Sequence, residues 1–283
     1  MALTNFVPDI WSARLLTSLS RKAVSGGIVN RDYEGDIARM GDSVKITNVV
    51  DPTIGTYTAH TDITINPASD ATQALLIDQS KYFAFEVDDV EKAQVVNAGA
   101  ALAALTDRAA YGLSNTLDAF VLTAAGAGGT AFGSADLAIN TATLAYDTLV
   151  DLRIQLDKND VPQEGRWAVI TPDYYGKILK DSRFIAAGDA TGAEVRANGF
   201  VGRAAGLNVY VSNNLPAGAG GANTTNKVTL VGYQGAITLA EQVREVEAFR
   251  MEKRFADGVK GLHLYGAKVT RPTGVLVADT VVS

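Results

Sequence analysis

The sequence has 283 residues, 47% of them hydrophobic, so the chain is long and apolar enough for one large domain or two ordinary ones. It has no cysteine and only two histidines, which excludes disulfides, thiolate chemistry, cysteine-bound metal centres and a three-histidine metal cage. The formal net charge of −6 argues against a dedicated nucleic-acid-binding protein, because such proteins normally carry a basic face. We therefore expect no metal and no other cofactor.

Neither end of the chain predicts a targeting or membrane segment. Residues 1–9 lack the basic and apolar regions of a secretory signal. No stretch reaches the roughly 18 uninterrupted apolar residues of a membrane helix. We therefore expect no membrane among the partners.

Residues 1–40 are predicted to form an arm rather than a domain. Pro8 fits the first turn of a short helix, which carries Trp11 and Leu15 and follows Phe6. A segment this short cannot bury such side chains by itself. They are expected to dock on the body of the chain or on a neighbouring molecule.

Residues 41–87 have a strand-like pattern with a long exposed middle. Apolar residues alternate with polar ones around Ile46, again at Ile63 and Ile65, and finally along 76–87. Between the first and last strands the sequence is rich in Thr and Asp and has few bulky residues. This composition favours a long, exposed hairpin over a packed sheet.

A long helix is predicted from Asp88 to about Leu122. Apolar residues recur at helical spacing from Val95 to Phe120, and acidic residues occupy the first turn, where the helix dipole favours them. The Gly- and Ala-rich segment 124–133 should end the helix. Its length would be roughly 50 Å, which is typical of a helix that braces an extended subunit or pairs with partners.

The rest of the chain is predicted to be an α/β unit followed by further strands. A helix should end near Asn159, and a second one should start at Thr171 as N-cap with Pro172 in its first turn. The expected strands lie at 167–170, 207–211, 227–231 and, in alternating form, between 262 and 277.

No catalytic pattern is evident. His263 lies in an alternating strand, where it should point outward or bond to a partner, and His60 lies in the hairpin, where it should be solvated. The run Gly126-Ala127-Gly128-Gly129 follows a helix instead of joining a strand to one, so it is interpreted as a helix-ending linker and not as a phosphate loop.

An acidic series near the C-terminus is a weak candidate for metal binding or glycoside hydrolysis. Basic residues interleave with it, which favours an ion-paired surface. The residues are Glu241, Arg244, Glu245, Glu247, Arg250 and Lys253.

The segments, taken in order, resemble the major capsid proteins of tailed bacteriophages with the Hong Kong 97-type (HK97-like) fold. The resemblance covers almost the whole chain and depends on several short motifs in the same order. They are Phe6-Val7-Pro8-Asp9-Ile10-Trp11, Arg31-Asp32-Tyr33-Glu34-Gly35, Gly41-Asp42-Ser43-Val44-Lys45-Ile46, Ile77-Asp78-Gln79-Ser80-Lys81-Tyr82-Phe83, Arg166-Trp167-Ala168-Val169-Ile170-Thr171-Pro172, Val201-Gly202-Arg203-Ala204-Ala205-Gly206 and Val211-Ser212-Asn213-Asn214-Leu215-Pro216.

The resemblance implies an α+β chain in five parts. They are an N-terminal arm (1–40), an extended β-hairpin loop (41–87), a peripheral domain with the spine helix (88–139), an α/β axial domain (140–250) and return strands of the peripheral domain (251–283).

The resemblance also implies a function, which is structural and not enzymatic. The expected role is a major capsid protein that self-assembles into hexamers and pentamers of an icosahedral shell around double-stranded DNA, without sequence-specific binding. Assembly is expected in the cytoplasm of the host bacterium, with a portal as a further partner, and the final location would be the virion capsid. Because the arm begins almost at Met1, we expect the scaffolding protein to be separate, if one is used.

Isopeptide crosslinks between subunits, which some relatives form, are not expected. Lys45 and Lys81 flank the hairpin, but nothing in the sequence supplies the acid or the asparagine partner that such a crosslink requires.

Three alternatives remain open at this stage: an encapsulin-like nanocompartment shell, a small-molecule enzyme on the 140–250 unit, and a monomeric binding module. For the capsid reading, contacts between subunits are expected at apolar residues of the arm and the loop, although each could pack within its own subunit. These residues are Phe6, Trp11, Leu15, Ile54, Tyr57, Ile63 and Ile65.

Overall fold

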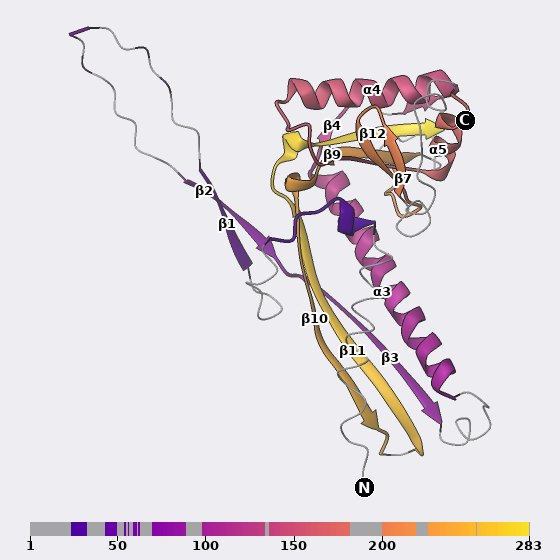
Figure 1. Ribbon diagram of the computed structural model, residues 1–283. Coiled ribbons are helices and arrows are strands. Elements are labelled where there is room, and N and C mark those ends of the chain that lie inside the picture. The colour runs from indigo at the N-terminus through magenta and orange to yellow at the C-terminus, as the bar shows by residue number, and fades with distance from the viewer. Residues whose placement is uncertain are drawn as a thin grey trace.

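The computed structural model shows an α/β lobe from which a long helix-and-sheet leg and a separate hairpin extend (Figure 1). We call these three parts the lobe, the leg and the hairpin. The structure describes residues 24–32, 43–49, 54, 56, 59–60, 62, 70–88, 98–133, 136–181, 200–218, 226–252 and 254–282.

The lobe is built on a seven-stranded mixed sheet. Its strand order is β4-β12-β9-β6-β8-β7, and β5 pairs in parallel with β12. The strands are β4 (Thr130–Ala131), β5 (Leu137–Ile139), β6 (Arg166–Ile170), β7 (Phe200–Ala204), β8 (Leu207–Val211), β9 (Lys227–Tyr233) and β12 (Val275–Val282).

Helices cover both faces of this sheet, and the alternation of side chains along the strands explains how. On β6, Trp167 and Val169 belong to the core beneath the C-terminal half of α3 (Ala98–Gly128). Ala168 and Ile170 point to the opposite face, which packs against two other helices. All five residues of β6 are buried, which is typical of a central strand between two helical layers.

The two helices on the second face form as their sequence predicts. In α4 (Ala142–Lys158) the buried residues recur every three or four positions, and the Thr141 side chain caps the first turn by accepting the Leu144 N–H. In α5 (Pro172–Ile178) the Thr171 side chain accepts the Tyr174 N–H in the same way. Both predicted helix boundaries, near Asn159 and at Thr171, are confirmed.

The leg consists of α3 lying along a three-stranded antiparallel sheet (Figure 1). The strand order is β10-β11-β3, with β3 (Gln79–Asp88), β10 (Ile237–Arg250) and β11 (Ala256–Val269). A register shift between Val243 and Glu245 adds a bulge to β10. The strands β10 and β11 are each 14 residues long, so the leg extends well beyond the lobe.

The sheets do not follow the expected unit boundaries at 250 and 251. The strand β10, expected in the 140–250 unit, pairs with β11 and belongs to the leg. The strand β12, expected to return with β11, pairs with β9 and belongs to the lobe. The chain therefore passes from lobe to leg and back, because the long β10–β11 pair continues past the edge of the lobe.

The predicted start of the long helix at Asp88 is wrong. Asp88 is the last residue of β3 and pairs with Ala256, since the alternation of Phe83 and Phe85 continues as a strand to this point. The described part of α3 has 31 residues and begins at Ala98.

The helix also ends later than the predicted Leu122, at Gly128. Its small residues let it approach the sheet closely: a Cβ on Gly128 would lie 2.8 Å from Cγ2 of Val269, and one on Gly129 would lie 2.6 Å from Cγ2 of Val277. The glycine run ends α3 as predicted, and it also lets the helix end pack closely against β11 and β12.

The hairpin strands β1 (Ser43–Val49) and β2 (Asp70–Leu76) pair in antiparallel register and project away from the body (Figure 1). A small core at the base joins them to the leg, formed by Ile46, Leu75, Ile77, Ala240 and Leu264. The side chains of Gln73 and Lys268 add hydrogen bonds across the same junction, to the carbonyls of Thr270 and Ala74.

Candidate functional site

Among the described residues, the hairpin is joined to the leg through a small core at its base. Ile54, between its two strands, is 95% exposed, and His60 is exposed as predicted. A two-stranded hairpin is at best marginally stable by itself, and an exposed isoleucine side chain adds no apolar burial to it. The other expected contact residues, Phe6, Trp11, Leu15, Tyr57, Ile63 and Ile65, lie outside the described residues.

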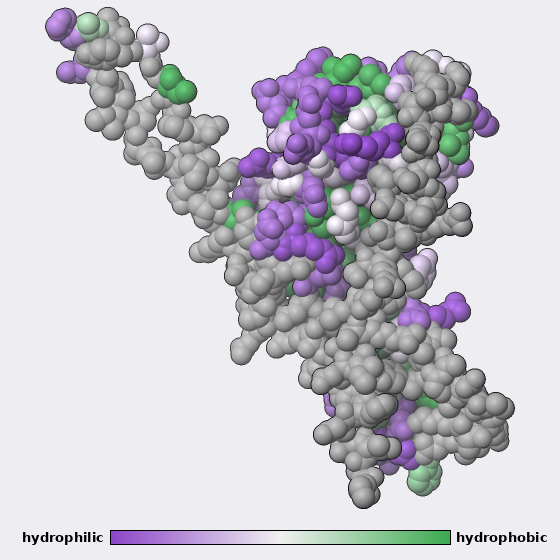
Figure 2. Space-filling model, in the orientation of Figure 1, coloured by the Kyte–Doolittle hydropathy of each residue, from purple (hydrophilic) through white to green (hydrophobic). Residues whose placement is uncertain are grey.

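Further apolar side chains are exposed on the leg and the lobe. Tyr82 on β3 is 79% exposed and stands opposite Leu262 of β11. On the face drawn in Figure 2, α4 carries hydrophobic side chains among hydrophilic ones, in agreement with the partial exposure of Leu144 and Ile154. Scattered residues of this kind are ordinary on a monomer and are not counted with the hairpin as a contact surface.

Exposed ion pairs surround the distal end of the leg sheet. Arg254 pairs with Glu86, and Arg250 pairs with Asp257, at 2.8 and 2.9 Å. Glu247, from the acidic series, pairs with Lys260 at 2.8 Å. Glu241 of the same series pairs with Arg31. The partners of these two glutamates, Lys260 and Arg31, are therefore not among the basic residues that interleave with the acidic series in the sequence.

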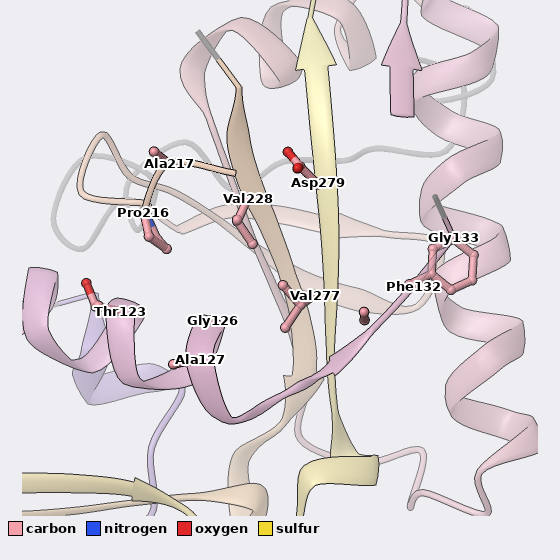
Figure 3. A pocket seen from close by; sticks show the side chains of 11 residues that line it. Thr123, Gly126, Ala127, Phe132, Gly133, Pro216, Ala217, Val228, Val277 and Asp279 are labelled. Carbon is pink, nitrogen blue, oxygen red and sulfur yellow. The ribbon is translucent and has the colours of Figure 1, made fainter. Parts of the chain in front are cut away.

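A cavity of about 370 Å³ lies between the end of α3 and the lobe sheet (Figure 3). Its walls are almost entirely apolar, with Asp279 and Thr123 as the polar side chains. The lining residues are Thr123, Gly126, Ala127, Ala131, Phe132, Gly133, Pro216, Ala217, Val228, Val277 and Asp279. The cavity has no convergent set of acid, base and nucleophile, so it has the chemistry of an apolar recess and not of an active site.

The described part of the chain shows neither a metal-binding cluster nor a helix that could span a membrane. It contains no group of three or more His, Asp or Glu side chains that could hold a metal ion. Among the same residues, no helix is long and apolar enough to cross a membrane.

His263 departs from its sequence-based interpretation. It is only 1% exposed, and neither ring nitrogen has a hydrogen-bond partner among the described residues, so within them it neither points outward nor bonds to a partner. Burial lowers the pKa of His263, an effect that nearby Glu241 opposes and Arg31 reinforces. The strand pattern predicted β11 but not the helix that covers this face, so sequence reasoning missed the burial.

Asp118 is a second buried ionisable group, which sequence reasoning missed. It lies on α3, is 4% exposed and accepts the N–H groups of Val24 and Ser25. Burial raises the pKa of Asp118, while the hydrogen bonds from Ser25 and Val24 partly offset the effect. The helical spacing of Ser114, Leu117 and Asp118 on one face was the available signal.

Comparisons with known proteins agree on the family. A family model described as phage capsid protein matches residues 72–278, well over half of the chain. A solved structure from Mycobacterium phage Che8 is 32% identical over 98% of each chain, with a TM-score of 0.71. The capsid structure of the cyanophage P-SCSP1u is 20% identical over 87% of this chain and 85% of that one, with a TM-score of 0.64.

The fold extends beyond phages. The virus-like particle from Pyrococcus furiosus is 11% identical over 94% of this chain and 96% of that one, with a TM-score of 0.55, which shows a shared fold alone. No curated protein sequence matches the chain significantly. The predicted HK97-like fold is confirmed. The chain therefore belongs to the phage capsid protein family: it is a structural, self-assembling major capsid protein whose place is the shell of the virion.

Proposed function

We propose that copies of this chain assemble as hexamers and pentamers into an icosahedral shell that encloses the double-stranded DNA genome of a tailed phage. The observation that carries the proposal is the projecting hairpin, with Ile54 95% exposed and only the hairpin base joined to the leg. A neighbouring subunit that covers the hairpin supplies the apolar burial that its own chain lacks.

The domain assignment is part of the proposal. The arm would be 1–40, the extended loop 41–87, the peripheral domain 88–139 with β10 and β11, and the axial domain the rest of 140–250 with β12. The hairpin fits the extended loop, and the leg, with α3 along its sheet, fits the peripheral domain. The pairing of β10 with β11 and of β12 with β9 supports placing β10 in the peripheral domain and β12 in the axial domain.

The proposed partners are copies of the chain, a separate scaffolding protein and a portal, with assembly in the cytoplasm of the host. The net charge of −6 supports a wall that encloses DNA without holding it tightly or reading its sequence. No function as an enzyme is proposed, because the described cavity has no catalytic set of side chains.

The direct test is to purify the protein with and without its candidate scaffolding protein and to examine it by electron microscopy and analytical ultracentrifugation. Closed shells or free capsomers are expected. A stable 29.7 kDa monomer at high concentration in both preparations would contradict the proposal. Shells filled with protein cargo instead of DNA would replace it with a nanocompartment function.

The role of the hairpin can be tested with Ile54→Asp. If a neighbour buries this side chain, the loss is about 2 kcal/mol per contact, or roughly thirtyfold weaker binding, so the concentration needed for shells should rise by at least tenfold. The matched control is Ile154→Asp on α4, also an exposed isoleucine. Assembly that is blocked by the control and unaffected by Ile54→Asp would show that the hairpin is not the contact.

A further inference from the structure

Residues 24–32, which we call the strap, are held against α3 at their first end by a buried carboxylate. The two oxygens of Asp118 accept separate hydrogen bonds, from the N–H of Val24 at 3.1 Å and from the N–H of Ser25 at 3.0 Å. These N–H groups open the short 3-10 turn η1 (Ser25–Gly27), so the carboxylate acts as its cap.

The other end of the strap is held by β10. Asn30 donates its N–H to the carbonyl of Ile237 at 2.8 Å and accepts the N–H of Leu239 at 3.0 Å. The next residue, Arg31, pairs with Glu241 at 2.8 Å. This end is therefore held by the Arg31–Glu241 ion pair, by two backbone hydrogen bonds and by the Gln234 side chain, which donates to the Val29 carbonyl at 3.4 Å.

His263 lies beside that ion pair. It is on β11, its Nε2 is 3.9 Å from Oε2 of Glu241, and its ring contacts the ring of Tyr265, which in turn packs on Phe120 of α3. Within the described part of the chain, both ring nitrogens of His263 and Oε2 of Glu241 are buried without a hydrogen-bond partner. Burying polar atoms without a hydrogen bond destabilises the fold. A proton on Nε2 of His263 would let this atom donate to Oε2 of Glu241, which would give both atoms a partner.

Groups from each neighbouring element act on this histidine in different ways. Glu241 from β10 favours its charged form and Arg31 from the strap disfavours it. Lys81 of β3 stands opposite His263 in register, but its side chain is exposed. Asp118 of α3 interacts electrostatically with Glu241.

We propose that protonation of His263 draws Glu241 from Arg31 to the imidazolium and releases the Arg31 end of the strap. The proton comes from solvent, and no covalent bond changes. A movement of about 1 Å by the carboxylate is enough to make a charge-assisted hydrogen bond to Nε2. Arg31 is the partner that leaves, because its side chain is 32% exposed while that of His263 is 1% exposed.

The direction of the pH effect follows from burial. Burial lowers the pKa of His263 below its usual 6.5, so the stability it contributes is present above that pH and is lost as the pH falls toward the folded-state pKa. Burial raises the pKa of Asp118, whereas the N–H groups of Val24 and Ser25 favour its charged form, so the Val24 end keeps its cap as long as this carboxylate stays ionised. Protonation of His263 therefore acts on the Arg31 end, and the Val24 end responds only to Asp118.

Amide hydrogen exchange on the full-length chain, in one fixed assembly state, tests this difference between the two ends. Exchange at about pH 5 and about pH 7.5 is compared after correction for intrinsic rates. The Asn30 amide should exchange about tenfold faster at the lower pH, whereas the Ile28 amide, bonded to the Ser25 carbonyl, should not change. His263→Gln should remove the response, and His60→Gln, at an exposed site, should keep it.

If His263→Gln does not fold, Arg31→Gln provides a second test of the same proposal. This variant should exchange rapidly at the Asn30 amide at both pH values, because its ion pair is already absent. The proposal is overturned if His263→Gln or Arg31→Gln retains the wild-type acid response. It is also overturned if the Ile28 amide opens together with Asn30.

Discussion

Replacing Gly266 by alanine tests whether the hairpin is fixed to the body by a close crossing of two backbones. Gly266 is on β11, directly beneath the turn between β2 and β3. A Cβ at this position would overlap the carbonyl oxygen of Leu76 and would lie 3.0 Å from Cα of Ile77. Both obstacles are backbone atoms, so no side-chain rotation can relieve them.

The expected cost of Gly266→Ala is that of overpacking, about 1–3 kcal/mol. For a chain of this size that corresponds to a fall in Tm of roughly 2 to 10 °C, measured by calorimetry or circular dichroism on unassembled protein. The hairpin base should also become more susceptible to limited proteolysis, since the small core around Ile77 and Leu264 must shift.

Gly112→Ala is the matched control. Gly112 lies in α3, and a Cβ there would meet nothing within 4 Å, so the same substitution should stabilise the protein by about 1 kcal/mol through helix propensity. The reasoning would be refuted if Gly266→Ala raised the Tm as Gly112→Ala does, or left it unchanged.

Two further substitutions test buried contacts. Asp118→Ala leaves the N–H groups of Val24 and Ser25 without an acceptor and should lower the free energy of unfolding by about 2 kcal/mol, measured by thermal denaturation. Asp118→Asn keeps one acceptor oxygen and should lower it less. Equal losses in the two variants would contradict the capping role of the carboxylate. Thr171→Ala removes the hydroxyl that accepts the Tyr174 N–H and should lower the free energy of unfolding by about 1 kcal/mol, measured by chemical denaturation. Thr171→Ser keeps the hydroxyl and should be nearly neutral. A similar loss in both variants would indicate that Thr171 acts by packing and not by capping.

Local elements were predictable where the signal lies within a few residues. The helix α5 begins at Thr171 because a hydroxyl cap and a proline at the first turn act over three positions. The strand β6 was predictable because Trp167 to Ile170 form a short, continuous apolar run, which is typical of a strand that is buried on both faces. The hairpin was predictable from composition, since its middle offers little to bury.

Features that depend on distant segments were not predictable in this way. The acidic residues at 88–91 look like the first turn of a helix, yet Asp88 is held in β3 by its pairing with Ala256, which is far away in the sequence. The glycines do end α3, at Gly128, but their close packing against β11 and β12 was not visible in the sequence. Tertiary pairing overrides local propensity at the predicted start of the helix.

The sequence by itself determined the class of the molecule: an α+β chain with a projecting hairpin, a long helix, no cysteine chemistry and motifs of a phage capsid protein. Only the tertiary structure decided which strands share a sheet, that β10 leaves the lobe and β12 returns to it, and that His263, Glu241 and Arg31 meet. The physical reason is range: caps and periodicity act over one or two helical turns, whereas the strap, α3 and the β10–β11 pair are brought together by burial of residues about a hundred or more positions apart.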